Sequence, residues 1–222
     1  DEMSYFRDEV GAAADERARF TTVFTPTTDG ETILPAGSES ANINGISYWS
    51  FGGKGDGLAT EFGRESLVPT SGTVKNLYIR MNGAPGAGNS VVYTVNKNSS
   101  STSLTCTVSD TNTTCNDTTN SFTVSAGDGI SLVQDLGALT GLRVFAFGVT
   151  LVPSTSGDFV LMVSAADAPL NTGVEYNHAI GSDTNWTSSE SIRQELGQTF
   201  TAKDIYAELN GTPGAGKSYA FT

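Results

Sequence analysis

The chain has 222 residues, of which 37% are hydrophobic and 16% charged, a composition that allows a globular fold with a buried core. Acidic residues outnumber basic ones by 24 to 12, and the resulting formal net charge of −12 argues against nucleic acid as a partner. No apolar run is long enough to span a bilayer, so we expect no membrane span. The chain begins at Asp1 without a basic and apolar leader, and we expect a processed or partial polypeptide.

Residues 1–19 differ from the rest and predict a short N-terminal helical arm. Met3, Phe6, Val10 and Ala13 recur at helical spacing, with acidic residues on the other face. A helix with so narrow an apolar stripe either lies as a strap on its own domain or docks on a neighbouring subunit. Both interpretations remain open at this point.

From residue 20 onward the apolar residues alternate with polar ones, and β-branched and aromatic residues are frequent. The alternation predicts strands over residues 20–25, 45–51, 73–81, 90–95, 103–108, 120–124, 130–133 and 142–152. Polar and glycine-rich clusters at 96–100 and 126–129 predict turns. The fold class that follows is all-β, with a jelly-roll-like β-sandwich unit over residues 20–153.

Two cysteines, Cys106 and Cys115, lie nine residues apart on either side of a polar turn. On two strands of a hairpin they would face each other, so we expect a disulfide and an exported protein. The alternative is a pair of unbridged thiols in a reducing compartment. No further Cys or neighbouring His completes a zinc site, and we predict no metal.

An internal repeat is the most informative feature of the sequence. Residues 74–94 align without a gap to residues 202–222 at an offset of 128, and ten of the 21 positions are identical. The repeat predicts a second sandwich unit over residues 158–222, which lacks counterparts of residues 95–152. We expect this incomplete unit to be covered by continuing polypeptide or by strands of another chain, because an open half-sandwich would expose its core.

The sequence predicts no catalytic residue and no cofactor. Gly211–Ser218 fits the letter pattern of a phosphate-binding loop, but residues of alternating β type follow it where that loop needs a helix. Asn89 stands at the place of Lys217 in the first copy, so we interpret the loop as a glycine-rich hairpin connection. His178 is the only histidine, and the carboxylates are scattered, so only a cleft formed on folding could unite two of them.

The region from Thr73 to Val133 contains NGAPGAGNS, then VVYTVNKN, then TSLTCTVSDTNTTCNDTTNSFTVSAGDGISL. This succession of turn and strand motifs resembles β-sandwich repeats of uncharacterised tailed-phage virion and tail-associated proteins, and of related bacterial surface proteins. The resemblance implies jelly-roll units and a structural or adhesive role, with no catalytic residues to carry over. Its motifs are turns and strand patterns, which carry little information about function.

The leading hypothesis is a non-enzymatic structural subunit of an extracellular assembly, most simply a phage virion component such as a tail fibre or capsid decoration. Its partners would be copies of itself in a homo-oligomer, or other structural subunits, at an extracellular or virion surface. A microbial cell-surface filament subunit or adhesin is the second hypothesis. The third is a carbohydrate-binding module for a cell-surface glycan, for which the candidate aromatic residues are Tyr48, Trp49, Phe51 and Trp186.

Overall fold

The computed structural model describes most of the chain up to residue 160 and shorter stretches after it. The described residues are 26, 30–38, 45–52, 54–55, 57–137, 139, 144–160, 173–176, 188, 199, 201–209 and 211–221. The expected N-terminal helical arm at 1–19 and the expected strand at 20–25 lie outside them. In the part of the chain that is described, no helix is long and apolar enough to cross a membrane.

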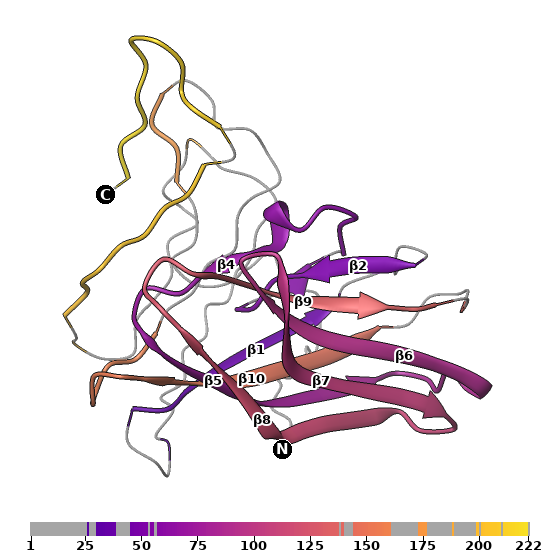
Figure 1. Cartoon of the computed structure of the whole chain (residues 1–222). Coiled ribbons are helices and arrows are strands. Elements are labelled where there is room, and N and C mark those ends of the chain that lie inside the picture. Colours follow the sequence, from indigo (N-terminus) through magenta and orange to yellow (C-terminus); the bar gives the residue numbers. More distant parts are fainter. Residues whose placement is uncertain are drawn as a thin grey trace, which may run out of the picture.

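The described residues form an all-β structure of two sheets (Figure 1). Its elements are β1 (Thr32–Ser38), β2 (Ile46–Trp49), β3 (Lys54–Gly55), the 3-10 helix η1 (Phe62–Arg64), β4 (Ser66–Leu67), β5 (Gly72–Met81), β6 (Gly86–Lys97), β7 (Ser100–Asp110), β8 (Thr114–Val124), β9 (Gly129–Asp135) and β10 (Phe145–Pro153). Sheet A has the order β3-β1-β10-β5-β8, and sheet B has the order β2-β9-β6-β7 with β4 also paired to β9. The pairing is antiparallel apart from the short β1–β3 contact. The expected all-β class is confirmed.

The strand order is that of a jelly roll. Without the two-residue strands β3 and β4, each sheet has four strands, ordered β1-β10-β5-β8 and β2-β9-β6-β7. The chain crosses between the sheets at almost every connection, so the first and last long strands, β1 and β10, lie side by side. Eight strands in two sheets with this connectivity define the architecture.

The inward faces of the two sheets share one hydrophobic core. Its centre is aromatic: Phe145 of sheet A lies with its ring centroid 4.8 Å from that of Trp49 and 5.1 Å from that of Tyr93, both in sheet B. Phe51 and Phe147 make a further edge-to-face contact at 5.4 Å. Edge-to-face geometry is the arrangement that aromatic pairs prefer, and these contacts fix how the sheets face each other.

Most of the predicted strands are present, with shifted ends. The predictions for 73–81 and 130–133 fall within β5 and β9, and both predicted turns connect strands as expected. The prediction for 120–124 covers only the last part of β8, which begins at Thr114. β1 was not predicted, because its sequence TILPAGS carries Pro and Gly; its antiparallel pairing with β10, far away in sequence, decides its conformation.

The repeat at the C-terminal end is described as residues 201–209 and 211–221, here called the C-terminal segment. These residues are drawn out and exposed, and none belongs to a named strand (yellow in Figure 1). Three left-handed backbone positions of the first copy recur in the second: Asn76 (φ 58°) in Asp204 (φ 57°), and Gly86 and Gly88 in Gly214 and Gly216. The sequence repeat is therefore accompanied by a repeat of local backbone conformation.

Candidate interaction surfaces

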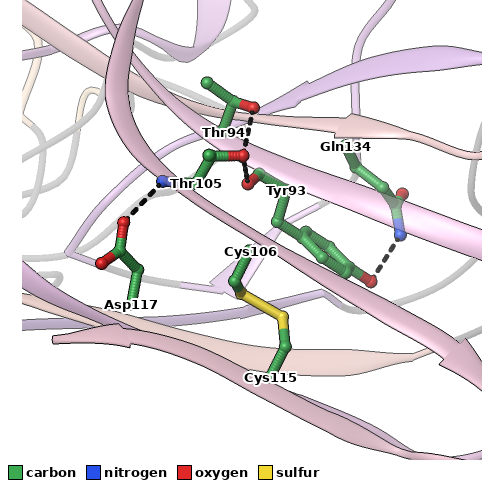
Figure 2. Close-up of a disulfide and its surroundings, with 7 residues drawn as sticks. All are labelled: Tyr93, Thr94, Thr105, Cys106, Cys115, Asp117 and Gln134. Atoms are coloured by element: carbon green, nitrogen blue, oxygen red, sulfur yellow. Dashed lines mark hydrogen bonds between the residues drawn. A yellow bond between two sulfur atoms is a disulfide. The ribbon is translucent and has the colours of Figure 1, made fainter. Parts of the chain in front are cut away.

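A row of inward-facing side chains crosses sheet B and ends at the disulfide. Ser47, Gln134, Tyr93 and Cys106 are cross-strand neighbours on β2, β9, β6 and β7. The Ser47 hydroxyl donates to Gln134 Oε1 at 3.1 Å. Gln134 Nε2 in turn donates to the Tyr93 hydroxyl at 3.0 Å, a bond shown in Figure 2. Burial raises the pKa of the Tyr93 phenol by more than the hydrogen bond from Gln134 lowers it. Tyr93 is therefore neutral, and so is the row to which it belongs. Its polar groups are buried but paired, which makes it structural.

Cys106 and Cys115 form a disulfide with their Cα atoms 5.8 Å apart, as the sequence predicted (Figure 2). Their strands follow each other in the chain, but β7 is an edge of sheet B and β8 is an edge of sheet A. The expected picture of two residues facing each other on one paired hairpin is therefore wrong in detail. The bond joins the two sheets, because the chain passes from one to the other between these residues.

Asp117 supports the same side of the sandwich and was not identified from the sequence. The register between β5 and β8 shifts at this point, so that residues 118–120 bulge from β8. The Asp117 carboxylate accepts backbone N–H bonds from Thr119 and Asn120 within the bulge, and one from Thr105 on the edge of β7 at 3.2 Å. Burial raises the pKa of Asp117, but these bonds outweigh it and lower the pKa to about 2.

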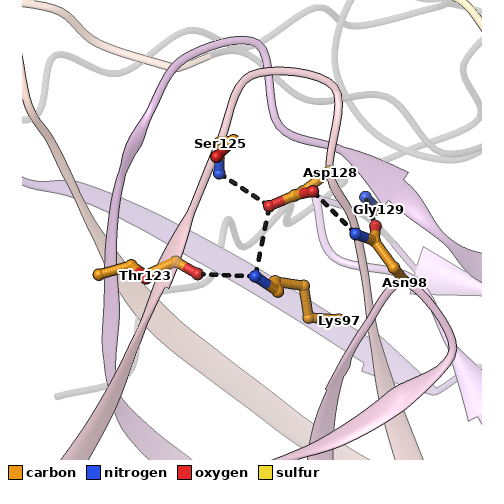
Figure 3. A network of polar contacts seen from close by, with 6 residues as sticks. All are labelled: Lys97, Asn98, Thr123, Ser125, Asp128 and Gly129. Carbon is orange, nitrogen blue, oxygen red and sulfur yellow. Dashed lines mark hydrogen bonds and ion pairs between the residues drawn. The ribbon is translucent and has the colours of Figure 1, made fainter.

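One end of the sandwich carries a network of polar contacts (Figure 3). The turn from β6 to β7 has two left-handed residues, Asn98 (φ 49°) and Ser99 (φ 58°), the conformation of a tight hairpin. Asn98 Nδ2 donates to Asp128 at 2.8 Å, and its Oδ1 accepts the Gly129 N–H at 2.8 Å. Lys97 Nζ lies 3.6 Å from the Asp128 carboxylate. Each of these contacts is made within the protein, and together they fix the two turns.

The segment before β4 is fastened to the outer face of sheet B by Glu61. One carboxylate oxygen of Glu61 accepts bonds from Asn96 Nδ2 at 2.9 Å and from the Ser131 hydroxyl at 2.6 Å. Glu65 follows on the same segment and accepts bonds from Ser99. Burial and the nearby charge of Glu61 raise the pKa of Glu65, with a smaller contribution from Glu208. No group of three or more metal-ligating side chains occurs among the described residues.

The C-terminal segment passes this end of the sandwich. Lys203 Nζ lies 3.0 Å from Asp158, and a Cβ placed on Gly127 would be 3.6 Å from the ring of Tyr206. The charge of Glu208 contributes to the environment of Glu65. These contacts attach the segment to the sandwich.

Two apolar side chains of the C-terminal segment are exposed, although their counterparts in the first copy are buried. Ile205 is 74% exposed, whereas Leu77 at the equivalent position of β5 is fully buried. Tyr219 is 43% exposed, whereas its counterpart Val91 on β6 is also fully buried. Ile205 and Tyr219, whose counterparts face the core in the first copy, are thus exposed to solvent in the second.

The structure separates the aromatic candidates from one another. Trp49 and Phe51 belong to the core, and Tyr48 is half-buried on the outer face of sheet B, so they form no exposed row. Trp186 and His178 lie outside the described residues. After Lys217 the chain is extended up to residue 221, without the helix that a phosphate-binding loop requires.

Comparison with models of protein families and with curated proteins found no match.

Proposed function

We propose that this protein is a non-enzymatic structural subunit of an extracellular assembly, and that it joins a second copy of itself through the C-terminal segment. The observation that carries the proposal is the exposure of apolar positions in this segment, whose counterparts in β5 and β6 are buried. A phage virion component is the form of assembly suggested by the sequence resemblance; a microbial surface filament is the alternative.

The free energy of burial supports an intermolecular role. Transferring a side chain such as Ile or Tyr from water into a packed interface is favourable by roughly 1.5–3 kcal/mol. Ile205 is largely in water and Tyr219 is 43% exposed in the single chain, although the segment repeats the strand-forming sequence of β5 and β6. A neighbouring sheet supplies both a cover for these side chains and hydrogen-bond partners for the extended backbone.

A second copy of the chain offers suitable strands. β7 and β8 each form one edge of their sheet, and in the first unit they are the neighbours of β6 and β5. The C-terminal segment resembles β5 and β6 in sequence, so it can add to the same class of edge on another molecule. Such a contact joins one surface to a different one, and repetition of it leads to a ring or a filament.

Light scattering coupled to size-exclusion chromatography tests the proposal over a range of protein concentrations. We expect the full chain to form dimers or larger species, and Ile205→Asp to weaken association at least tenfold. Ile46→Asp is the matched control, because Ile46 is likewise an exposed isoleucine, at 50%, but lies on the outer face of sheet B. A wild-type chain that stays monomeric throughout, or association unaffected by Ile205→Asp, would contradict the proposal.

A further inference from the structure

The outer face of sheet A carries an exposed tyrosine in an open position. Tyr78 on β5 is 57% exposed, and its cross-strand neighbours are Gly148 on β10 and Asn116 on β8. On the other side of Gly148 the next neighbour is Pro35 on β1, which is also exposed. Gly148 contributes no side chain between Tyr78 and Pro35, so the row consists of two apolar groups with a shallow gap between them and an amide at one end.

The internal repeat distinguishes Tyr78 from the residues that serve packing. The inward positions of the aligned strands all differ between the copies; Leu77 is replaced by Ile205 and Ile79 by Ala207. Tyr78, which points away from the core, is identical in the second copy as Tyr206. A core tolerates exchange among apolar residues of similar volume, so packing in the core does not account for the identical tyrosine.

The backbone that directs this tyrosine outward is repeated as well. Asn76 has a left-handed conformation at the register shift between β5 and β8, and Asp204 has the same conformation two residues before Tyr206. A β-bulge turns the side chains that follow it, and Asn and Asp are the residues that best tolerate this conformation. Both copies therefore keep the tyrosine and a left-handed residue two positions before it.

The chemistry of the row suits a neutral sugar. A tyrosine ring offers a flat apolar surface to the C–H face of a pyranose and a hydroxyl at its rim. The Asn116 amide has donors and an acceptor in one plane, which matches neighbouring sugar hydroxyls. Lys75 on the same face is paired with Glu31 at 2.8 Å, and the net charge of −12 opposes acidic polysaccharides.

We infer that the outer face of sheet A around Tyr78 is a binding site for a neutral hexose polymer, with Tyr78 as the stacking residue and Asn116 as the polar contact. This site is separate from the C-terminal segment, and it does not depend on the proposed self-association. It would allow the assembly to adhere to a glycan-bearing surface.

Native gel electrophoresis through gels that contain hydroxyethyl cellulose or mannan tests the site in the full-length chain. We expect at least one of the two polymers to retard the wild-type protein. Tyr78→Ala should weaken the apparent affinity at least tenfold and Asn116→Ala several-fold, while Tyr78→Phe should stay within about threefold. Ile46→Ala on the opposite face should leave the affinity unchanged. Thermal unfolding followed by circular dichroism verifies that each variant is folded.

Three outcomes would overturn the inference. The wild-type chain could migrate normally in both gels. It could be retarded only by alginate, which is acidic. Folded Tyr78→Ala could bind as tightly as the wild type, which would place any sugar site elsewhere on the protein.

Discussion

A single carboxylate connects the edge strands β7 and β8 at one position, and both strands otherwise remain edges of their sheets. Asp117 accepts N–H bonds from its own bulge and from Thr105 on the edge of β7, so one carboxylate satisfies donors of both sheets. An unpaired N–H on an edge strand invites pairing with other chains, and a side-chain acceptor removes that possibility at this position. Close by, the Cys106–Cys115 disulfide joins the two sheets covalently.

Removal of the Asp117 carboxylate should destabilise the protein in a pH-dependent way. The pKa of Asp117 falls from 3.8 to about 2 on folding, so the unfolded chain binds more protons between these values. The stabilisation is complete above about pH 4 and is lost as the pH falls through about 2. We expect Asp117→Ala to lower the free energy of unfolding by roughly 1–2 kcal/mol at pH 6. The difference from the wild type should shrink towards pH 2.

Urea unfolding at the two pH values measures this effect. Asp135→Ala is a suitable control, because Asp135 is exposed and accepts one backbone bond, from the Gly137 N–H. An equal loss of stability at pH 6 and pH 2 would show that the carboxylate charge is not involved.

Two contacts between strands hold the sandwich together, a covalent one between β7 and β8 and a close backbone approach between β5 and β10. The disulfide links β7 to β8, and the close approach of β5 to β10 depends on Gly72. A Cβ at Gly72 would lie 2.5 Å from the Val152 carbonyl oxygen and 3.1 Å from the Cα of Pro153. Both contacts are with backbone, which cannot move without disturbing the sheet.

Gly72→Ala should therefore lower the free energy of unfolding by about 1–3 kcal/mol, because the added methyl group forces β5 and β10 apart. Gly37→Ala on β1 provides the control, since a Cβ there would meet its nearest atom, the Phe145 carbonyl oxygen, at an ordinary 3.7 Å. Thermal or urea unfolding of both variants gives the comparison. Equal stabilities would show that the two strands are not in such tight contact.

Loss of the disulfide should also be measurable. Closing a loop of nine residues lowers the entropy of the unfolded chain and raises its free energy by about 2.5 kcal/mol in the chain-entropy treatment. The double variant Cys106→Ser, Cys115→Ser should unfold at correspondingly lower urea concentration than the wild type. Mass spectrometry under non-reducing conditions provides the direct test, because two free thiols in the purified protein would contradict the bond.

The sequence predicted elements where local periodicity and burial agree, and missed those decided by distant partners. Residues 73–81 alternate clearly, and β5 follows that pattern. The first half of β8 is a polar run, TCNDTTN, whose strand conformation depends on pairing with β5. Asp117 lies in that run, and no sequence motif marked it. Tyr78 could have been found, because comparison of the two repeat copies shows an identical tyrosine among apolar positions that all differ.

The two copies of the repeated sequence differ in what covers their apolar side chains. In the first copy the alternating residues are enclosed by strands β7 to β10; in the second they face solvent. We therefore expect a neighbouring molecule to provide that cover.

Photo-crosslinking between differently labelled copies tests whether a second molecule covers the exposed side chains of the C-terminal segment. A photoreactive amino acid replaces Ile205 in the full chain, and equal amounts of unlabelled and nitrogen-15-labelled protein are mixed, irradiated and digested. The account predicts cross-linked peptides that join a labelled and an unlabelled chain, with the attachment on β7 or β8. Cross-links confined to single chains, or none above the level seen with the reactive residue at Ile46, would contradict it.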